Sequence, residues 1–396
     1  MQKIILQKSN EILQKLIHHR HFLHSIPEIG FDTDKTSEYI YSALCTLGIE
    51  CFFICKNTVV ANIKGNKSGK TILLRADIDA LILKEETGLE FASKNNNMHA
   101  CGHDMHTAML LGAAEVLCSI KEDLCGNVRL LFQPAEEILS GAKKAIENGV
   151  LDGVDCAITL HVMPNTDFPT GSVLLSYDTP SAPSADFFEI KITGKGCHGS
   201  SPSLGVDPIT CACRVVTSLE HIRAYETGIH SKAVLTIGQI SGGSNANAIP
   251  DEVLLKGSLR CFDEELRAFY KKRFEEITNG ICSAFGCKSV IAYTSGCPML
   301  INDTHLLDRV CENLSELLGK DNVVKIKDSR SKVQGSEDFA YISQKVPSAS
   351  IAIPAGKASD GYKFPLHSPK VTFDEKALEV GCGVYAYCAL SILKEI

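Results

Sequence analysis

A histidine- and cysteine-rich segment carries the strongest chemical signal in this 396-residue chain. Between His99 and His106 lie three histidines, one cysteine and one aspartate, and such residues are costly to bury without partners. Cys101 and His103 are two positions apart, and Gly102 lets the backbone bend between them, so both side chains can point to one side. Thiolate and imidazole are common ligands of zinc-like cations. The segment therefore predicts a metal site that includes Cys101 and His103.

A pair of adjacent carboxylates, Glu136 and Glu137, is the second chemical signal. Neighbouring carboxylates repel each other, so we expect a cation beside them. Because neighbouring side chains point in different directions, one of the two can bind a metal while the other acts as a general base. A solvated acidic turn is the alternative, and the apolar run 127–132 and Pro134 before the pair disfavour it.

Two isolated histidines, His161 and His367, each follow a short apolar run. Taken alone, each is more typical of a structural hydrogen-bonding histidine than of a ligand. They gain weight because a site for two cations needs five or six protein ligands, one of them bridging, and the residues above are too few. Asp77, which ends another apolar run, could orient a ligating histidine from behind.

The elements that must position these residues alternate along the chain. Apolar strand-like runs near residues 71–74, 127–132, 156–160 and 350–353 alternate with helical patterns, of which 105–119 and 140–148 are the clearest. This alternation predicts an α/β domain with a mostly parallel sheet. Ligands of such sheets bind beyond the carboxyl ends of the strands, which is where the candidate residues fall.

Residues 186–294 follow a different pattern, with the order strand, helix, strand, strand, helix, strand. Asp207 and Asp263 are placed as N-caps of the two helices. The order is that of a ferredoxin-like α+β domain. Because an α/β pattern resumes afterwards, we expect an inserted domain over residues 184–296, with residues 1–183 and 297–396 forming the first domain.

Composition excludes several classes of protein. Lys and Arg number 40 against 47 Asp and Glu, a net charge of −7 without a basic stretch, which argues against nucleic acid as a partner. No apolar run approaches the roughly 20 residues of a membrane span, and the first eight residues do not resemble a secretory signal. Residues 65–71 resemble a phosphate-binding loop but lack one residue between the glycines and precede a strand, so nucleotide binding is disfavoured.

Cysteine usage indicates a reducing compartment. The chain has 17 cysteines, an odd and scattered set without a Cys-x-x-Cys pair. A disulfide framework is typical of short secreted chains, so we expect reduced thiols, most of them buried, in a cytoplasmic protein.

These residues and the motifs around them resemble those of the M20 family of metallo-amidohydrolases and peptidases. The resemblance is to the branch of aminoacylases, hippurate hydrolases and indole-acetyl-amino-acid hydrolases in particular. The resemblance covers nearly the whole chain in order. Its motifs lie at Arg20–Glu28, Arg75–Leu81, Met98–Asp104, Phe132–Glu137, Gly194–Gly199, Gly242–Pro250, Ser336–Phe339 and Leu366–Pro369.

The resemblance implies two divalent metal ions per chain and roles for individual residues. The implied ligands are Cys101, which would bridge the ions, with His103, Glu137, His161 and His367. Glu136 would be the general base, and Asp77 would support a ligand. In the inserted lid or dimerisation domain, His198 would approach the scissile carbonyl, and Asn247 and Arg260 would help to hold the substrate.

The resemblance further implies a hydrolase that cleaves the amide bond of N-acyl amino acids, giving a carboxylate and a free amino acid. A dipeptidase or aminopeptidase is the enzymatic alternative, and a non-catalytic ligand-binding protein on the same scaffold is the other. Manganese or zinc is expected, with nickel or cobalt as alternatives. The acyl group and the oligomeric state, a dimer or a tetramer, are left open.

Overall fold

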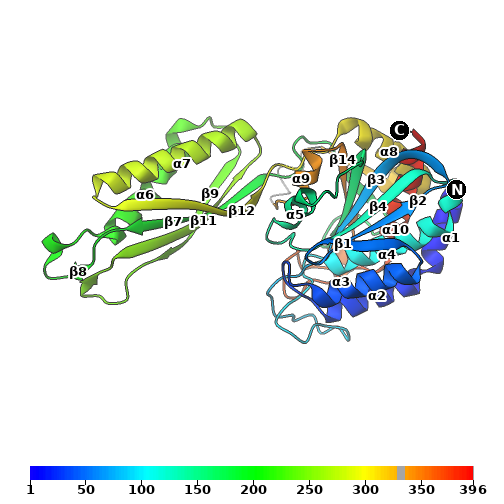
Figure 1. Cartoon of the computed structure of the whole chain (residues 1–396), viewed down its shortest axis with the longest axis horizontal. Coiled ribbons are helices and arrows are strands. Elements are labelled where there is room, and N and C mark those ends of the chain that lie inside the picture. Colours follow the sequence, from blue (N-terminus) through cyan, green and yellow to red (C-terminus); the bar gives the residue numbers. More distant parts are fainter. Residues whose placement is uncertain (328–334, 396) are drawn as a thin grey trace. The chain divides into compact units, whose positions relative to one another are not determined.

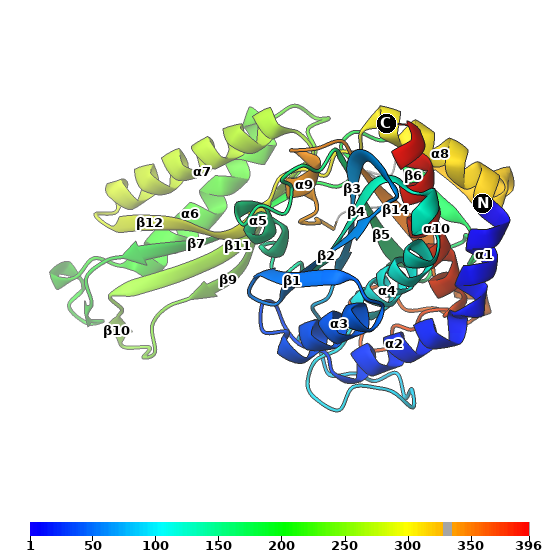
Figure 2. The same cartoon turned by 45° about the vertical axis from the view of Figure 1, so that its right-hand side comes forward.

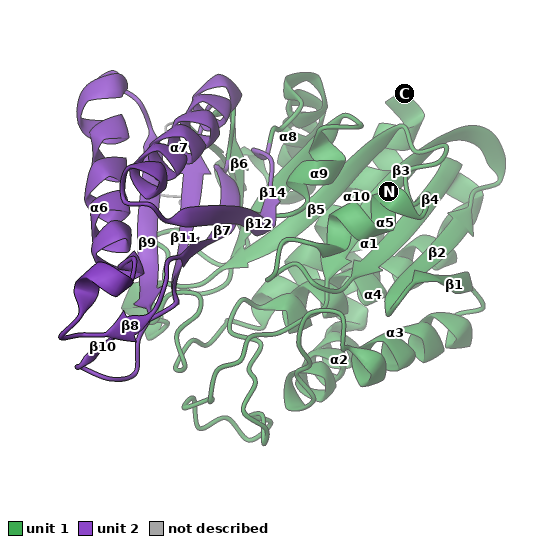
Figure 3. Cartoon of the chain, turned by 60° about the vertical axis from the view of Figure 1, so that its left-hand side comes forward, with its two compact units in different colours: residues 1–181, 301–333, 337–396 green, residues 182–300, 334–336 purple. Residues whose placement is uncertain are grey.

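The computed structural model describes residues 1–327 and 335–395, which form two compact units (Figures 1 and 3). Unit 1 comprises residues 1–181, 301–333 and 337–396, and unit 2 comprises residues 182–300 and 334–336. The boundaries predicted from the sequence, at 184 and 296, differ from these by a few residues. The functional roles assigned to the two parts stay predictions.

Unit 1 is built on an eight-stranded mixed sheet with the strand order β1-β2-β4-β3-β5-β14-β6-β13. The four central strands run parallel, as the sequence predicted, and they are β4 (Cys125–Gln133), β3 (Lys67–Asp77), β5 (Cys156–Met163) and β14 (Ser348–Pro354). Antiparallel pairs join β4, β2 and β1 on one side, and β14 and β6 on the other. The outer strands are β1 (Glu50–Cys55), β2 (Thr58–Lys64), β6 (Val173–Ser176) and β13 (Val323–Ile326).

Burial explains why the central strands read as short apolar runs. Ile72, Leu73 and Leu74 of β3 are all fully buried, as expected for a strand that is covered on both faces. Two strand ends differ from the prediction. β3 begins at Lys67, so part of the loop-like segment 65–71 is strand, and β5 continues past His161 to Met163.

Helices cover both faces of this sheet. α4 packs against α10 and β3, whereas α5 and α9 pack against each other beside β4 and β14 on the other side (Figure 2). The sequence pattern predicted one helix over 9–24, but the structure divides this region at Ile12. The helices of unit 1 are α1 (Gln2–Glu11), α2 (Leu13–Ser25), α3 (Asp34–Thr46), α4 (His103–Ser119), α5 (Gly141–Glu147), α8 (Thr304–Leu318), α9 (Ala340–Ser343) and α10 (Lys376–Glu395).

Helix α10 corrects one sequence expectation. Among the described residues it is long and apolar enough to cross a membrane by length and composition, although no such run was expected. Most of it is buried inside unit 1, where it packs against α4, α8 and the sheet. Its apolar character is therefore explained by packing, since a helix that is apolar all round is typical of a protein core.

Unit 2 has a four-stranded antiparallel sheet with the order β12-β7-β11-β9, covered by two helices. Asp207 and Asp263 cap these helices as predicted, by accepting hydrogen bonds from backbone N–H groups of the first turn. The predicted ferredoxin-like order is confirmed by β7 (Ser184–Thr193), α6 (Pro208–His221), β9 (Ala233–Ser241), β11 (Glu252–Cys261), α7 (Glu264–Ala284) and β12 (Lys288–Cys297).

A short two-stranded ribbon in unit 2 was not predicted. It consists of β8 (Cys197–His198) and β10 (Ala248–Ile249), which pair in antiparallel fashion. Strands of two residues have no periodicity to detect, so only the structure shows that the segments near His198 and Asn247 lie together.

All 17 cysteines lie in the described residues and none forms a disulfide. More than half of them are buried, as expected for reduced thiols that behave as small apolar side chains.

Candidate metal centre

The predicted ligands come together in unit 1, close to where β3, β4 and β5 end. Their donor atoms form overlapping groups in which all atoms lie within 4.8 Å of one another. One group is Cys101, His103 and His161, and a second is Cys101, Glu137 and His367. The structure thus places the five predicted ligands in one connected cluster, with Cys101 in both groups.

Backbone contacts set the orientation of two histidines in this cluster. The Nδ1 atom of His103 lies 2.9 Å from the carbonyl oxygen of Asp79, and Nδ1 of His161 lies 2.8 Å from the carbonyl oxygen of Val162. A carbonyl only accepts hydrogen bonds, so both Nδ1 atoms carry the proton. In the neutral ring each Nε2 atom then keeps its lone pair, and Nε2 of His161 lies 3.5 Å from Cys101 Sγ. This is the tautomer in which a histidine binds a metal through Nε2.

Unpartnered buried atoms test whether a cation fits. His103 Nε2 and Glu137 Oε1 are buried, 3.9 Å apart, and without any hydrogen-bond partner. Nε2 of His367 lies 3.7 Å from the same Glu137 oxygen. Buried polar atoms are normally satisfied, and these are Lewis bases that face one another. A divalent cation among a thiolate, three imidazoles and a carboxylate satisfies them, so the residues fit a metal.

Glycine is required between the two central ligands. Gly102 has a φ of +83° and is the N-cap of α4, which begins at His103. A Cβ atom here would lie 2.4 Å from Cγ2 of Val162. Neither the backbone conformation nor the available space accepts a larger residue, so Gly102 directs Cys101 and His103 into the same cluster.

The carboxylate pair is held by a residue that the sequence did not single out. Both oxygens of Asp79 accept hydrogen bonds from backbone N–H groups, one from Glu136 at 3.0 Å and one from Glu137 at 3.2 Å. Ala135 precedes the pair with a φ of +63°, which is costly for a residue with a side chain and is typical of functional sites. The Asp-x-Asp spacing of Asp77 and Asp79 was the sequence signal that could have identified Asp79 as part of the site.

Burial governs the electrostatics of the cluster. It raises the pKa of the Glu136 carboxyl well above its ordinary value, and the nearby carboxylates of Glu337 and Glu137 raise it further. It also raises the pKa of the Cys101 thiol well above its ordinary value. A thiolate at Cys101 therefore needs a positive charge beside it, which a divalent cation supplies.

Asp77 lies behind the cluster and hydrogen-bonds His106, which is not among the predicted ligands. Its Oδ1 accepts a 2.6 Å hydrogen bond from Nδ1 of His106, and its Oδ2 lies 3.7 Å from Nε2 of His103. Nε2 of His106 accepts a hydrogen bond from the backbone N–H of Val162. Since both ring nitrogens are used, His106 is no candidate ligand, although it belongs to the histidine-rich segment.

The remaining predicted residues belong to unit 2. His198 and Asn247 are exposed and lie together at the β8–β10 ribbon, where the N–H of Gly199 donates to the Asn247 carbonyl. Arg260 lies near the other end of β11, about 25 Å along the strand from Glu252, and donates to Ser336 Oγ at 2.9 Å. Unit 2 therefore brings two of the three residues together, and their roles stay predictions.

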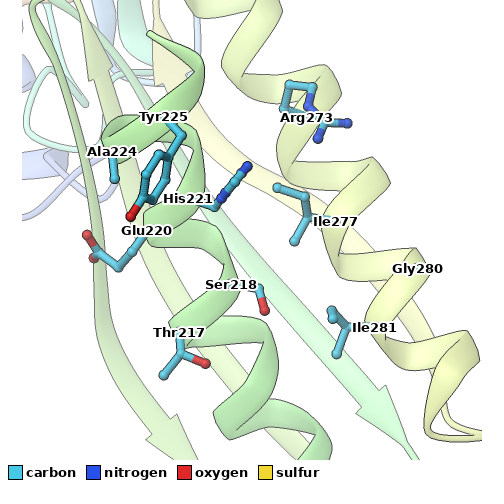
Figure 4. Close-up of a pocket in the computed structure, with 10 residues that line it drawn as sticks. All are labelled: Thr217, Ser218, Glu220, His221, Ala224, Tyr225, Arg273, Ile277, Gly280 and Ile281. Carbon is cyan, nitrogen blue, oxygen red and sulfur yellow. The ribbon is translucent and has the colours of Figure 1, made fainter. Parts of the chain in front are cut away.

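A pocket on unit 2 lies between α6 and α7 and has a volume of about 570 Å³ (Figure 4). The only fully charged cation in its lining, Arg273, is already paired with Glu226. None of the predicted site residues lines this pocket, so it adds nothing to the metal centre.

Comparison with known proteins identifies the family. Residues 73–391 match the model of Peptidase family M20/M25/M40. The chain is 40% identical over 367 residues to the N-acetyl-L-cysteine deacetylase of Bacillus subtilis, covering 92% of this chain and 85% of that protein. It is 38% identical over 296 residues to the N-acyl-L-amino acid amidohydrolase of Geobacillus stearothermophilus, covering 74% and 79%.

Comparison with solved structures supports the same family. The crystal structure of the Bacillus subtilis YXEP protein, described as a dinuclear metal-binding peptidase of the M20 family, superimposes with a TM-score of 0.80 at 33% identity, covering 98% of this chain and all of the other. This chain therefore belongs to the M20 peptidase family, with the fold that the sequence predicted and a donor cluster fit for metal ions.

Proposed function

We propose that this protein is a metal-dependent amidohydrolase that cleaves N-acyl amino acids into a carboxylate and a free amino acid. One observation carries the proposal. Glu136 is buried beside the donor cluster, with Oε2 3.9 Å from Nε2 of His103, while the five predicted ligands can satisfy a metal without it. A buried carboxyl that is next to a metal and not needed as a ligand is suited to proton transfer.

Each residue then has a defined task. When bound, two divalent cations lower the pKa of a water molecule and polarise the amide carbonyl. Glu136 accepts the proton of that water and donates it to the leaving amine. His198 donates to the oxygen of the carbonyl as negative charge develops there, and Asn247 and Arg260 hold the substrate, with Arg260 suited to bind a carboxylate through its two parallel N–H groups.

The nature of the metals belongs to the same proposal. Cys101, His103, Glu137, His161 and His367 would hold the ions, with the Cys101 thiolate as the ligand that the two would share. Manganese or zinc is the expected metal, with nickel or cobalt as alternatives, because one thiolate among imidazoles and a carboxylate accepts all four.

A dipeptidase or aminopeptidase is the second candidate, favoured by the description of the related YXEP protein as a peptidase. Such an enzyme needs an acidic or amide anchor for the free α-amine of its substrate, and the sequence offered none. A non-catalytic protein would be expected to lack Glu136 or some of the ligands, and this chain retains all of them.

The test is a substrate panel on metal-reconstituted protein. Purified protein is stripped with a chelator, loaded with manganese, zinc, cobalt or nickel, and given acetyl, benzoyl, succinyl and indole-acetyl amino acids beside the matching free dipeptides. Release of amino acid from the acylated compounds alone supports the proposal. Faster turnover of dipeptides with a free amine favours the peptidase, and no turnover with any metal contradicts both.

Two further expectations concern the setting of the enzyme. We place it in the cytoplasm, because an odd and scattered set of 17 cysteines is more typical of reduced thiols than of a secreted disulfide framework. Its partner is a small-molecule substrate rather than nucleic acid or a membrane. Light scattering of the purified protein would distinguish the dimer and the tetramer that remain open.

A further inference from the structure

Arg75 is a fully buried cation that none of the proposed catalytic steps uses. It lies on β3, two residues before Asp77, and its planar guanidinium contacts several segments of unit 1. Nη1 donates to Asp77 Oδ2 at 2.7 Å and Nε donates to Gln133 Oε1 at 3.0 Å. Nη2 donates to Asp338 Oδ1 at 2.7 Å and lies 3.1 Å from Glu337 Oε1.

One branch of these contacts leads to the ligand His161. Asp77 uses one oxygen for Arg75 and the other for Nδ1 of His106. Nε2 of His106 then accepts the N–H of Val162, whose carbonyl accepts from Nδ1 of His161. The residue that orients the His161 ring is therefore held in turn by a chain of hydrogen bonds that starts at Arg75.

The other branch leads to Glu136. Asp338 is fully buried and accepts hydrogen bonds from Arg75, from the side-chain amide of Gln133 and from the backbone N–H of Ala142. This fixes the segment after Ser336, so that carboxylate oxygens of Glu337, Asp338 and Glu136 lie within 4.8 Å of one another. Three carboxylates this close repel one another, and Arg75 is the cation that contacts two of them.

We propose that Arg75 is a positioning residue of the metal centre, which orients His161 through Asp77 and His106 and holds Glu337 in place beside Glu136. The inference rests on the proposed function. Geometry as well as charge is required, because a guanidinium presents five N–H donors in one plane whereas an ammonium presents three donors at one point. Arg75→Lys therefore keeps the charge and loses the simultaneous contacts.

A matched control lies on the neighbouring strand. Arg129 of β4 is partly buried, and it donates to Asn62 Oδ1 and to the carbonyl oxygens of Val150 and Asp152, none of which belongs to the donor cluster. Arg129→Lys thus removes a comparable set of hydrogen bonds that serves only the fold. Its metal affinity and kcat should stay within about twofold of wild type.

The experiment measures zinc affinity by competition with a chromophoric chelator, and kcat and KM for an N-acetyl amino acid at saturating metal. Arg75→Lys should weaken zinc binding roughly 10–100-fold, the usual effect of losing a residue that orients ligands. At saturating metal, kcat should remain lowered roughly tenfold or more with a smaller change in KM, because Glu337 is displaced beside Glu136. An Arg75→Lys protein that matches Arg129→Lys in zinc affinity and kcat overturns the proposal.

Two milder variants test the branches separately if Arg75→Lys does not fold. His106→Gln breaks the chain towards His161 and should weaken zinc binding. Glu337→Gln should leave zinc binding unchanged and lower kcat. Wild-type zinc affinity in His106→Gln together with wild-type kcat in Glu337→Gln overturns the proposal.

The zinc measurement needs no substrate, so the two proposals can fail separately. A wild-type protein that binds zinc but hydrolyses no acyl amino acid contradicts the proposed function, while the affinities of Arg75→Lys and His106→Gln still decide the role of Arg75. A wild-type protein that binds no metal overturns both.

Discussion

The donor cluster of unit 1 and the β8–β10 ribbon of unit 2 both contain predicted site residues, but they differ in how far those residues are buried and held in place. In unit 1, His103 and Glu136 are at most 6% exposed, and backbone groups and Asp79 hold them in place. In unit 2, His198 is exposed and its Nδ1 lies 2.8 Å from Oγ of Ser200, two residues further on. Under the proposed roles, the donor residues are organised before substrate arrives, whereas His198 would gain its functional contact only with substrate bound.

The largest effect is expected from Glu136→Gln. The amide cannot accept a proton, so kcat should fall by about 10³-fold or more. Metal content should stay near wild type, because the five predicted ligands remain. Inductively coupled plasma spectrometry beside steady-state kinetics measures both. The exposed Glu147→Gln on α5 is the control, and activity within tenfold of wild type in Glu136→Gln would contradict its role as the base.

Cys101→Ser should weaken metal binding by more than about a hundredfold, and activity should fall with it. This is a larger loss than the roughly 10–100-fold usual for a residue that only hydrogen-bonds to a ligand. A serine hydroxyl has a far higher pKa than a thiol and is a poor bridging ligand. Cys156→Ser, at a buried cysteine of β5 outside the cluster, should cost stability without loss of metal. Two ions still bound to Cys101→Ser would argue against a bridging thiolate.

His198→Ala should lower kcat roughly a hundredfold, as for a lost oxyanion donor, with little change in KM. Since the side chain is exposed, the melting temperature and metal content should stay unchanged. His230→Ala, also exposed in unit 2, is the control. A variant with normal kcat and reduced stability would instead assign His198 a structural role in the ribbon.

The smallest effect is a pH dependence of stability that belongs to unit 1. Burial by itself lowers the pKa of His24, but the carboxylates of Asp104 and Glu85 outweigh it and raise the pKa to about 9. The folded state thus binds this proton more tightly than the unfolded chain, whose histidine pKa is about 6.5. The stabilisation is complete below about pH 6.5 and is lost as the pH rises through about 9, a change on the order of 3 kcal/mol.

Denaturant unfolding of metal-free protein between pH 6 and pH 10 measures this loss. His24→Gln should flatten the decrease in the free energy of unfolding, whereas His230→Gln in unit 2 should not change it. An equally steep decrease in wild type and His24→Gln would show that another group is responsible.

Much of the candidate site could be predicted because its residues are chemically unusual at their positions. Cys101, His103 and the Glu136–Glu137 pair are recognisable from residue type and spacing, and the structure brings them together as expected. His161 and His367 were ambiguous alone, since an isolated histidine has no local signal. Asp79 and Arg75 lie in the 75–81 motif but were given no role, because most of their side-chain partners are more than 50 positions away in the chain.

Local sequence patterns were sufficient to predict the alternation of strands and helices, the helix caps at Asp207 and Asp263, and the chemistry of the candidate ligands. Each of these features depends mainly on residues that are neighbours in the sequence. The break at Ile12, the burial of α10 and the β8–β10 ribbon came only from packing between distant segments. The same holds for the tautomers of His103 and His161 and for the network around Arg75. Orientation and charge balance in a buried site depend on groups that the folded chain assembles from several strands, and spacing along one segment does not contain that information.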